Sequence, residues 1–580
     1  MKYILIILSS MLFSVSYAQQ WGVTEHPRFV RTDRMHVVRQ NVHADDIITA
    51  DVRSRSVDIS ISGILPSEVK PLLAKTNLWH QYELPYKRFT PVIEGQHCPT
   101  GCIALAMSQV MHYYRYPERG IGSNQYIDSL GCKETLYSDF SSHVYDWNNM
   151  LYEYDHTEYN DIQADAVARL QYDCGISVNM CYGKDASGAI SVRQPIALVN
   201  NFGYDKGAQI YYRDFYTYDE MQMMLKNELA NKRPVLISGT NMDNSHAFVI
   251  DGYNEDDEFH IMLGNPDGQA DNWTTLENMT ADDYNYGKGT PENGFNILQS
   301  FILGIQPKTK DSDANEHHLF VFRNISALIQ KAGRNDSFTI ATNDLCNVGC
   351  NLHEDSVSLM LVKNNQLVMP LYTYSHEFLL EEVDDTTYCD TLDIVFPKNI
   401  TAGQYNIVPM YKDNGKWKEA RTCIGTPNYL MADISNEGII LSSDTANTAY
   451  ITLEGITVPD LMFNAYANDF SITLKAHNTE ICGRVYVKLE ALTEGGKDFY
   501  LQRHGITMKK NEEKCYHYSA SKVWVHKLGK YRLHVYYESN LFTDELIELP
   551  LPNEVIIDFI DRSHIQIASS ISPISTAVLN

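Results

Sequence analysis

The stretch that most constrains how this chain folds runs from Pro99 to Pro117 and reads PTGCIALAMSQVMHYYRYP. Its apolar residues recur three and four positions apart, which predicts a buried helix that ends at Pro117. These apolar positions are Ile103, Ala106, Met107, Val110, Met111 and Tyr114. The Gly101-Cys102 pair stands at the front of the pattern, so we expect Cys102 in the first turn of the helix.

A thiol at the start of a helix has a special electrostatic environment. The unpaired amides and the dipole of the helix N-terminus favour the thiolate, and so they lower the pKa of the thiol. The same amides can hold a developing oxyanion. Gly101 removes side-chain bulk next to the sulfur. A cysteine at a helix start can also be an ordinary core residue, so a nucleophilic role needs a base elsewhere in the chain.

His246 has the best setting for that base. It opens an apolar strand-like run, follows the small polar residues Asn244 and Ser245, and precedes a turn at Gly252. The start of a strand holds an imidazole rigidly at a sheet edge, and a thiol nucleophile needs a histidine within hydrogen-bond reach. Taken alone, His246 is more readily explained as a structural histidine. Together with Cys102, it indicates a Cys–His pair.

The order of periodicities predicts an α+β domain over residues 69–308, in which a helix packs on an antiparallel sheet. Further helical patterns cover Asp161–Tyr172, Val192–Phe202 and Tyr218–Asn231. Strand-like runs then cover Pro234–Ser238, His246–Gly252, Phe259–Leu263 and Phe295–Gln306.

From about residue 318 the apolar residues alternate with polar ones, as in Tyr531–Tyr537 and Val485–Glu490. Period two predicts half-buried strands, and Asn364-Asn365 and Asp413-Asn414-Gly415 are turn signals between strands. We expect two immunoglobulin-like β-sandwich domains at residues 309–435 and 436–580. A short repeat supports two units, because Gly403-Gln404-Tyr405 resembles Gly529-Lys530-Tyr531.

The N-terminal residues predict export. Residues 1–18 combine a basic start, an apolar run and the cleavage signature Ser16-Tyr17-Ala18, which together indicate a secretory signal peptide. Residues 19–68 occupy the place of a prosegment, and a linker or an accessory strand pair is the alternative. No later apolar run has the length of a transmembrane segment. We expect a secreted, periplasmic or surface-associated protein.

Charge and cysteine spacing exclude several function classes. The net charge of -26 argues against nucleic acid or an anionic membrane as a partner. The 11 cysteines contain no CxxC pair, so we expect no zinc site and no other metal or cofactor. His97, Cys98 and Cys102 lack a second ligand cluster, and residues 267–272 read as an acidic turn with too few oxygen donors for calcium. Export permits disulfides, whose pairing stays open; the candidates are Cys346, Cys350, Cys389, Cys423, Cys482 and Cys515.

Several segments, in the same order, resemble the streptopain family of secreted papain-like cysteine peptidases. They include Trp79-His80-Gln81, Thr100-Gly101-Cys102, Val178-Asn179-Met180, Asn201-Phe202-Gly203-Tyr204 and His246 through Gly252. The resemblance implies an endopeptidase made as a zymogen and acting on proteins or peptides. It implies that Cys102 is the nucleophile, that His246 is the general base and that the Gln81 amide helps to form the oxyanion hole. Ser187, Gly188, Ser238 and Gly239 would line the substrate cleft.

One departure from the family concerns the group that orients the histidine. The family has Asn-Trp where this chain has Met262 and Leu263, and methionine cannot accept a strong hydrogen bond from an imidazole N–H. Asn265 and Asp267 are the candidates to replace the orienting group. The alternative is a catalytically impaired, peptidase-fold protein that binds or adheres, with a cell-surface or host-protein ligand for the β-domains.

Two smaller questions also follow from the family comparison. Cys181 stands where the family usually has Asp, and either a disulfide with Cys174 or simple packing would accommodate it. Transglutaminase-like acyl transferases also combine a helix-borne Cys with a strand-borne His, but the family-specific segments around Cys102 and His246 argue against them.

Overall fold

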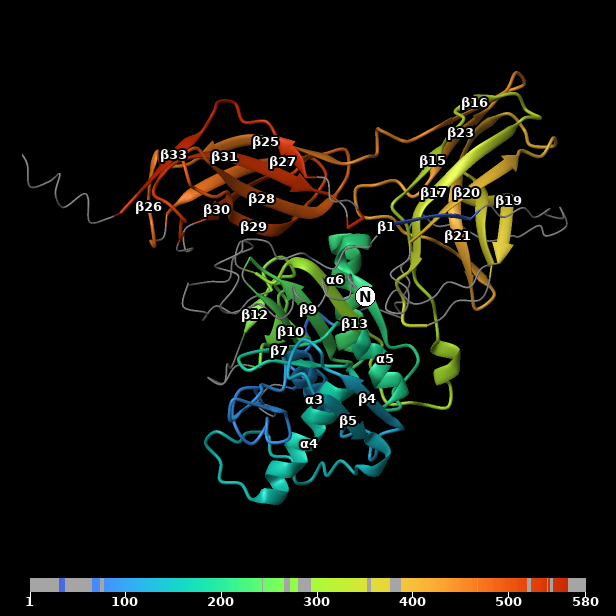
Figure 1. Cartoon of the computed structure of the whole chain (residues 1–580). Coiled ribbons are helices and arrows are strands. Elements are labelled where there is room, and N and C mark those ends of the chain that lie inside the picture. Colours follow the sequence, from blue (N-terminus) through green and yellow to red (C-terminus); the bar gives the residue numbers. More distant parts are fainter. Residues whose placement is uncertain are drawn as a thin grey trace, which may run out of the picture.

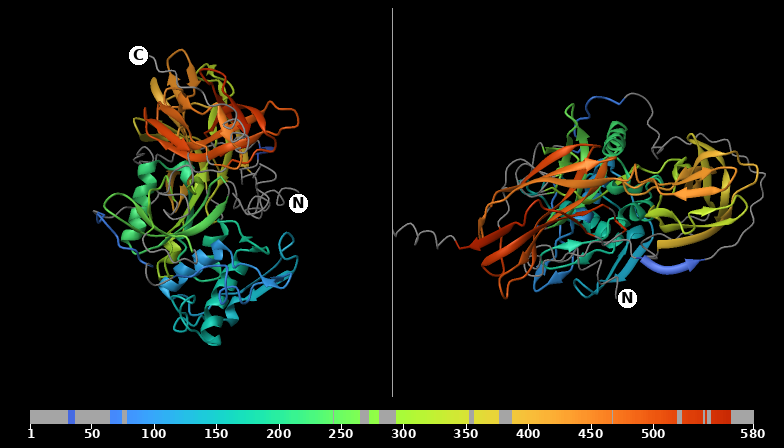
Figure 2. Two further views of the ribbon diagram at one scale, coloured as in Figure 1. Left: turned by 90° about the vertical axis from the view of Figure 1, so that its left-hand side faces the viewer. Right: turned by 90° about the horizontal axis from the view of Figure 1, so that it is seen from above.

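The computed structural model describes residues 31–36, 65–73, 78–242, 244–264, 272–279, 294–351, 356–375, 387–466, 468–518, 523–539, 541–542 and 546–561. These residues form an α+β region and two β-rich bodies that lie side by side over one end of it (Figure 1). The views in Figure 2 show the same arrangement from the side and from above. The predicted signal peptide and most of the predicted prosegment lie outside the described residues.

The α+β region is built on a six-stranded sheet of order β12-β11-β10-β9-β13-β8, in which every neighbouring pair is antiparallel. The strands are β8 (Gln209–Tyr212), β9 (Val235–Thr240), β10 (Ser245–Tyr253), β11 (Phe259–Met262), β12 (Trp273–Thr274) and β13 (Ile297–Leu303). Three short hairpins accompany this sheet: β2 (Val92–Ile93) with β3 (Gln96–His97), β4 (Ser123–Ile127) with β5 (Thr135–Asp139), and β6 (Cys181–Tyr182) with β7 (Ser187–Gly188).

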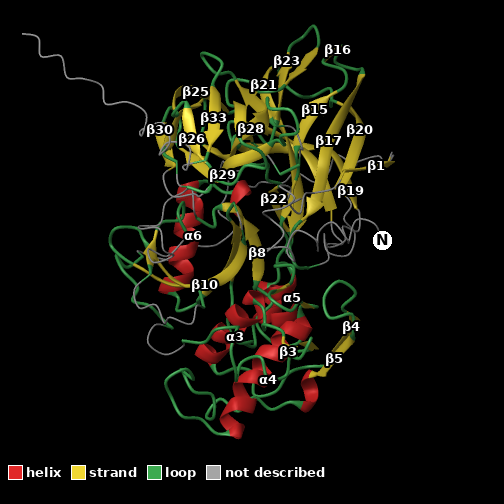
Figure 3. Ribbon diagram, turned by 60° about the vertical axis from the view of Figure 1, so that its left-hand side comes forward, coloured by secondary structure: helices red, strands yellow, loops and turns green. Residues whose placement is uncertain are grey.

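The four predicted helices are present and, among the described residues, the α-helices all lie in this region (Figure 3). They are α3 (Cys102–Tyr114), α4 (Asp161–Ser177), α5 (Arg193–Asn200) and α6 (Tyr218–Ala230). Reciprocal capping boxes fix the starts of α4, through Asn160 and Gln163, and of α6, through Thr217 and Glu220. The described part of the chain also contains three 3₁₀ turns: η1 (Phe140–Ser142), η2 (Arg213–Phe215) and η3 (Ser312–Asn315).

Strand β10 is buried on both faces, which explains its almost continuous apolar sequence. Ala247 and Val249 belong to the core that contains α3, whereas Phe248 and Ile250 belong to the core that contains the apolar residues of α6. Alternate residues of a strand point to opposite faces, so α3 and α6 cover opposite sides of the sheet. The predicted packing of a helix on an antiparallel sheet is confirmed.

The first β-rich body has two sheets whose apolar side chains share one core. The first sheet contains β14 (Phe320–Val321), β15 (Asn324–Ala327), β17 (Ser337–Asn347) and β20 (Thr387–Val395), with β1 (Arg31–His36) added in parallel to β20. The second contains β16 (Lys331–Ala332), β18 (Ser356–Lys363), β19 (Gln366–Ser375), β21 (Gly403–Asp413), β22 (Lys416–Glu419), β23 (Leu430–Ile434) and β24 (Ile439–Ser442). Strand β24 pairs with β23, so this sheet extends past residue 435.

The second β-rich body also places a core between two sheets. Its three-stranded sheet contains β25 (Tyr450–Thr457), β27 (Phe470–His477) and β30 (Glu513–Tyr518). Its larger sheet contains β26 (Leu461–Phe463), β28 (Ile481–Ala491), β29 (Phe499–Met508), β31 (Gly529–Glu538), β32 (Ile547–Leu549) and β33 (Ile556–Ile560). We call these two bodies the first and the second sandwich.

The turn signals and the repeat fall at defined places in the sandwiches. Asn364 and Asn365 both have positive φ, at 51° and 61°, and connect β18 to β19. Positive φ at both central residues is the geometry of a tight hairpin turn. The two copies of the repeat begin β21 and β31, each of which lies inside its sheet with a neighbour on both sides.

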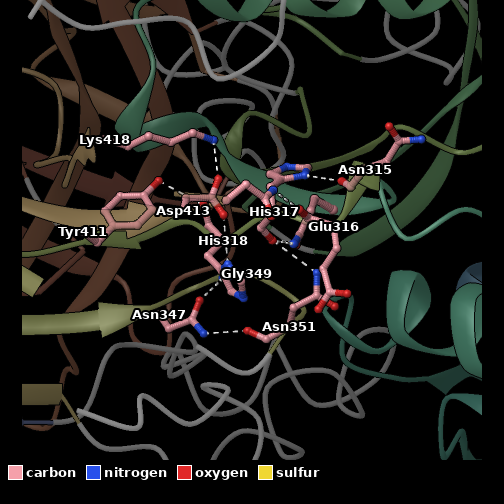
Figure 4. A network of polar contacts seen from close by, with 12 residues as sticks. Asn315, Glu316, His317, His318, Asn347, Gly349, Asn351, Tyr411, Asp413 and Lys418 are labelled. Atoms are coloured by element: carbon pink, nitrogen blue, oxygen red, sulfur yellow. Dashed lines mark hydrogen bonds and ion pairs between the residues drawn. The ribbon is translucent and has the colours of Figure 1, made fainter. Parts of the chain in front are cut away.

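A polar network joins the α+β region to the first sandwich (Figure 4). The buried Asp413 carboxylate accepts from Nδ1 of His318 at 3.0 Å and pairs with Nζ of Lys418 at 2.6 Å. The neighbouring His317 contacts the hydroxyl of Tyr211 on β8 at 2.8 Å through Nε2. Residues 315–318 therefore connect β8, at the edge of the six-stranded sheet, to β21 by side-chain contacts as well as by the chain itself.

The cysteines with described side chains do not form the disulfides that export would permit. None of the ten cysteines whose side chains are described forms a disulfide; Cys389 lies outside that set. Cys174 is buried, with Sγ 3.5 Å from Sδ of Met111, and Cys181 is buried and free, so packing accommodates both. Within the described ranges, none of the helices has the length and apolar character that crossing a bilayer requires. The described side chains contain no cluster of three or more metal-ligating groups.

Candidate active site

Cys102 is the first residue of α3, as the sequence predicts. The residue before it, Gly101, has φ 91°, which favours glycine, and a β-carbon there would lie 2.6 Å from the side chain of Met180. No described side chain caps this helix end, and its first turn has no acidic residue. The backbone amides at the start of α3 therefore act on Cys102 without competition from a capping group.

His246 is the second residue of β10 and lies opposite Gly239 of β9. Its imidazole stacks on Phe248, two residues further along the same face, with ring centroids 5.8 Å apart. The side chains of Cys102 and His246 meet in a hydrogen bond between α3 and the start of β10. Both residues are half-buried rather than enclosed.

The two side chains shift each other's pKa in opposite directions. Burial alone would raise the pKa of the Cys102 thiol, but the hydrogen bond and positive charge of His246 outweigh burial and lower it. The backbone N–H groups of Ala247 and Ile103 add to this lowering. Burial alone would lower the pKa of His246, but the Cys102 thiolate and the carbonyl of Leu263 raise it. The pair therefore favours a thiolate beside an imidazolium.

A backbone carbonyl orients the imidazole. Nε2 of His246 lies 2.8 Å from the carbonyl oxygen of Leu263. A carbonyl can only accept, so Nε2 carries a proton and Nδ1 of the neutral ring is left to accept the proton of the thiol. This is the tautomer that a general base for Cys102 needs.

The orienting group is thus not a side chain at Met262 or Leu263. The Leu263 side chain is buried at 3% exposure in the core that contains α6, while its backbone oxygen faces His246. The two side chains that the sequence suggested for this role, Asn265 and Asp267, lie outside the described residues. The imidazole N–H therefore has a backbone acceptor in place of the Asn side chain that the family resemblance implies.

Gln81 lies close to the start of α3. Its backbone carbonyl accepts from the N–H of Thr100 at 3.2 Å. Thr100 lies two residues before Cys102, so this bond holds the segment of Gln81 against the start of α3. The side chain is buried, and its Nε2 donates to the hydroxyl of Tyr82 at 3.4 Å. Gln81 is therefore held beside the helix end that carries the thiol.

The four predicted cleft residues fall on two sides of this centre. Ser187 and Gly188 form β7, and the carbonyl oxygen of Ser187 lies 3.2 Å from the position of a β-carbon at Gly101. Ser238 and Gly239 lie on β9 opposite Ala247 and His246. Gly239 is buried, because the backbone of Phe295 crosses directly over it. Ser238 keeps partial exposure and accepts from Oγ of Ser191 at 2.8 Å.

Phe295 is a site residue that the sequence did not single out. Its ring lies 5.5 Å from the imidazole of His246 and 5.9 Å from the ring of Phe248. A β-carbon at Gly239 would be 2.3 Å from the carbonyl oxygen of Phe295. Phe295 therefore forms an apolar wall against His246. Its place just before β13 carries no local pattern that would reveal this contact.

Other cysteines show how specific the environment of Cys102 is. Burial, aided by the charge of Asp128, raises the pKa of Cys98 to about 11, and burial raises the pKa of Cys132 to about 12. The pKa values of Cys174, Cys181, Cys423 and Cys482 are also raised, mainly by burial. Cys98, only four residues before Cys102, therefore keeps its proton at a pH at which Cys102 ionises.

Comparison with known proteins agrees with this geometry. Residues 79–273 match the Peptidase C10 family. Streptopain of Streptococcus pyogenes is 34% identical over 254 residues, which are 41% of this chain and 63% of streptopain. The thiol protease/hemagglutinin PrtT of Porphyromonas gingivalis is 30% identical over 255 residues, which are 43% of this chain and 29% of PrtT. The chain thus spans less than two thirds of the length of these relatives.

Among solved structures, the active wild-type interpain A cysteine protease of Prevotella intermedia is 30% identical, with 41% of this chain and 95% of interpain A covered and a TM-score of 0.37. A fragment of prointerpain A from the same organism is also 30% identical, with 43% and 77% covered and a TM-score of 0.36. The family match, the identity to streptopain and the Cys–His pair at the start of α3 converge on one assignment. Through its α+β region, the chain belongs to the Peptidase C10 family of streptopain-like, papain-like cysteine peptidases.

Proposed function

We propose that the α+β region, residues 69–308, is a cysteine endopeptidase that hydrolyses peptide bonds of proteins, with Cys102 as the nucleophile and His246 as the general base. The observation that carries the proposal is the meeting of Cys102, at the start of α3, with His246, at the start of β10, whose Nε2 is held by the Leu263 carbonyl at 2.8 Å. The contact lowers the pKa of the Cys102 thiol and raises the pKa of His246. A thiolate beside an imidazolium is the state from which a thiol attacks a carbonyl.

The proposed reaction follows from the atoms that meet at this centre. The Cys102 thiolate attacks the scissile carbonyl carbon, and the new oxyanion accepts from the backbone N–H of Cys102 and from the side-chain amide of Gln81. The imidazolium of His246 then gives its Nδ1 proton to the leaving amine, which leaves a thioester. A water molecule that loses its proton to the neutral imidazole attacks the thioester and releases the acid.

The replacement of the family's Asn-Trp by Met262 and Leu263 favours the alternative of a catalytically impaired binding or adhesion protein. The Leu263 carbonyl supports activity instead, because it supplies the acceptor that fixes the imidazole. In other triad enzymes the third group acts by holding the tautomer and the orientation of the base. A backbone oxygen performs both tasks whatever side chain stands at the position.

We also propose that the protein is exported through residues 1–18 and kept as a zymogen by residues 19–68. The two sandwiches, expected from the sequence at residues 309–435 and 436–580, are proposed to be immunoglobulin-like modules that hold a cell-surface or host-protein ligand. Because β24 pairs with β23, we place the junction between them after Ser442 rather than after residue 435. Their support is the strand alternation of the sequence and the shared cores of paired sheets.

The test is hydrolysis of casein by the full chain, freed of its prosegment and kept reduced. Cys102→Ala and His246→Ala should each lower kcat by at least about 1,000-fold, because nucleophile and base act as one unit. Cys98→Ala is the matched control, since it removes a buried thiol of raised pKa four residues away. Turnover that survives in Cys102→Ala, or a wild-type protein without turnover, would contradict the proposal.

A further inference from the structure

Strand β29 of the second sandwich contacts the α+β region at two points close to His246. Nη2 of Arg503 donates to the carbonyl oxygens of Asn241 and Met242, at 3.3 and 3.2 Å. Two residues further along, the backbone N–H of Gly505 donates to Oδ1 of Asn296 at 2.8 Å. Residues two apart in a strand face the same side, so one face of β29 makes both contacts.

The intervening residue confirms which face this is. His504 points into the second sandwich, where its Nε2 lies 2.7 Å from the hydroxyl of Tyr518, and it is 1% exposed. Arg503 and Gly505 are therefore the part of β29 that faces the α+β region.

The first segment that β29 contacts leads directly into the strand of His246. Asn241 and Met242 belong to the turn between β9 and β10, and β10 begins at Ser245. The turn is closed by the N–H of Asn241, which donates to the carbonyl of Asn244 at 2.9 Å. Arg503 therefore fixes the backbone from which His246 projects.

The second segment carries the apolar wall against the imidazole. Asn296 follows Phe295, whose ring lies 5.5 Å from His246. The approach is close, because a β-carbon at Gly505 would lie 2.0 Å from the carbonyl oxygen of Asn296. Nδ2 of Asn296 donates to the carbonyl of Glu277 at 2.7 Å, and the Glu277 carboxylate pairs with Lys514 of β30. The second sandwich thus contacts the segment of Phe295 and Asn296 directly through β29, and indirectly, by way of Glu277, through β30.

The second sandwich is fastened in place by a buried ion pair. Nη2 of Arg484 on β28 lies 2.6 Å from the carboxylate of Asp214 in η2, and both side chains are almost fully buried. Separation of such a pair would leave an uncompensated buried charge, which is strongly unfavourable. Phe542 also joins the core that contains Phe215 and α6. The ion pair and the shared core therefore keep the second sandwich docked, and β29 stays in contact with the segments next to His246.

We propose that Arg503 and Gly505 of the second sandwich are positioning residues for His246, so that the catalytic pair is held in register only when this sandwich is docked. The inference rests on the proposed peptidase function. A general base must stay within hydrogen-bond reach of its partner, and a displacement of about 1 Å can lower a rate on the order of 100-fold. Arg503 holds the turn that leads into β10 in position, and Gly505 holds the backbone next to Phe295, whose ring packs against His246.

The test uses the full chain with Arg503→Ala, Arg503→Lys and Gly505→Ala. Arg532→Ala is the matched control, because Arg532 is an arginine of the same sandwich whose partners, Glu490 and Glu554, belong to that sandwich. Active sites are titrated with an irreversible thiol inhibitor, and kcat and KM on a peptide substrate are expressed per titrated site. The pH dependence of Cys102 alkylation by iodoacetamide is measured in parallel.

Arg503→Ala and Gly505→Ala should lower kcat per titrated site at least tenfold while KM changes less than about twofold. The midpoint of alkylation should move to higher pH, because a misplaced imidazolium stabilises the thiolate less. Arg503→Lys should recover part of kcat, since an ammonium can still donate to both carbonyls. Arg532→Ala should match the wild-type protein.

Unchanged kcat per titrated site and an unchanged alkylation midpoint in both variants would overturn the inference. A fall in the number of titratable sites alone, with kcat per site kept, would mean that β29 contributes only stability and would overturn it too. The alkylation profile needs no turnover. A wild-type protein that does not hydrolyse peptides would therefore contradict the proposed function, whereas the profile would still decide the positioning role.

Discussion

At the residue scale, Cys102 is set apart from the other thiols by its neighbours rather than by its exposure. Burial acts on it as on Cys98, but only Cys102 meets a histidine and the free amides of a helix start. His246 in turn keeps its proton because a thiolate and a carbonyl face its two nitrogens. The chemistry of the site is therefore a property of the pair.

The pair predicts a distinct pH dependence. A lowered pKa means that Cys102 is a thiolate below the ordinary cysteine pKa of about 8.5, and a raised pKa means that His246 keeps its charge above its ordinary value of about 6.5. Alkylation of Cys102 by iodoacetamide should be half-maximal at a lower pH than alkylation of an ordinary cysteine. In His246→Ala the midpoint should move to higher pH, because the raising effect of burial is then opposed only by the backbone N–H groups of Ala247 and Ile103. Identical midpoints in the two proteins would contradict the ion pair.

Gly239 gives a second test at this scale. A β-carbon there would meet the backbone carbonyl of Phe295 at 2.3 Å, and a backbone atom cannot rotate away. Gly239→Ala should therefore push Phe295 off His246 and lower kcat at least tenfold. Gly455→Ala on β25 is the control, since its β-carbon would find only ordinary contacts at 3.8 Å. Equal kcat values in the two variants, measured on folded protein, would show that the contact of Phe295 with His246 does not affect catalysis.

At the element scale, much of the α+β region follows from local sequence. The helix of Cys102 and the strand of His246 were predictable because a period near 3.6 and an uninterrupted apolar run both lie within a few residues. The hairpin turn at Asn364-Asn365 was predictable because few residues accept positive φ at two successive positions.

Other parts of the site leave no local trace in the sequence. The acceptor of His246 is a backbone oxygen, which every residue possesses, so Leu263 could not be identified from its side chain. Phe295 and Arg503 act through contacts with segments distant in sequence. Such contacts depend on how the α+β region and the sandwiches pack against each other. The spacing of apolar residues in the sequence does not indicate which surfaces will meet.

The link between β21 and residues 315–318 makes a prediction about acid stability. Burial would raise the pKa of Asp413, but His318 and Lys418 outweigh burial and lower it to about 2. An unfolded aspartate has a pKa of about 3.9, so Asp413 contributes stability that is complete above pH 4 and is lost as the pH falls towards 2. The contribution is on the order of 2 kcal/mol.

Asp413→Asn should therefore lower the urea midpoint at pH 7, and the difference from the wild-type protein should shrink between pH 4 and pH 2. Asp433→Asn on β23 serves as the control, because Asp433 is exposed. A difference between Asp413→Asn and wild type that stays constant down to pH 2 would exclude the lowered pKa as its cause.

At the scale of the whole molecule, a Peptidase C10 region carries two sandwiches on one end of its sheet (Figure 1). The second sandwich shares a buried ion pair and an apolar core with the α+β region and lies next to the strand of His246. This arrangement makes the C-terminal half part of the catalytic unit in our account, in addition to any ligand that the sandwiches bind.

The most direct test of the central claim is to incubate the reduced, prosegment-free chain with a biotinylated epoxysuccinyl probe and to map the labelled residue by mass spectrometry. Our account predicts labelling at Cys102 and not at Cys98, and loss of labelling in His246→Ala, because the probe reacts with an activated thiolate. No labelling of a reduced Cys102, or equal labelling in His246→Ala, would contradict an assembled catalytic pair.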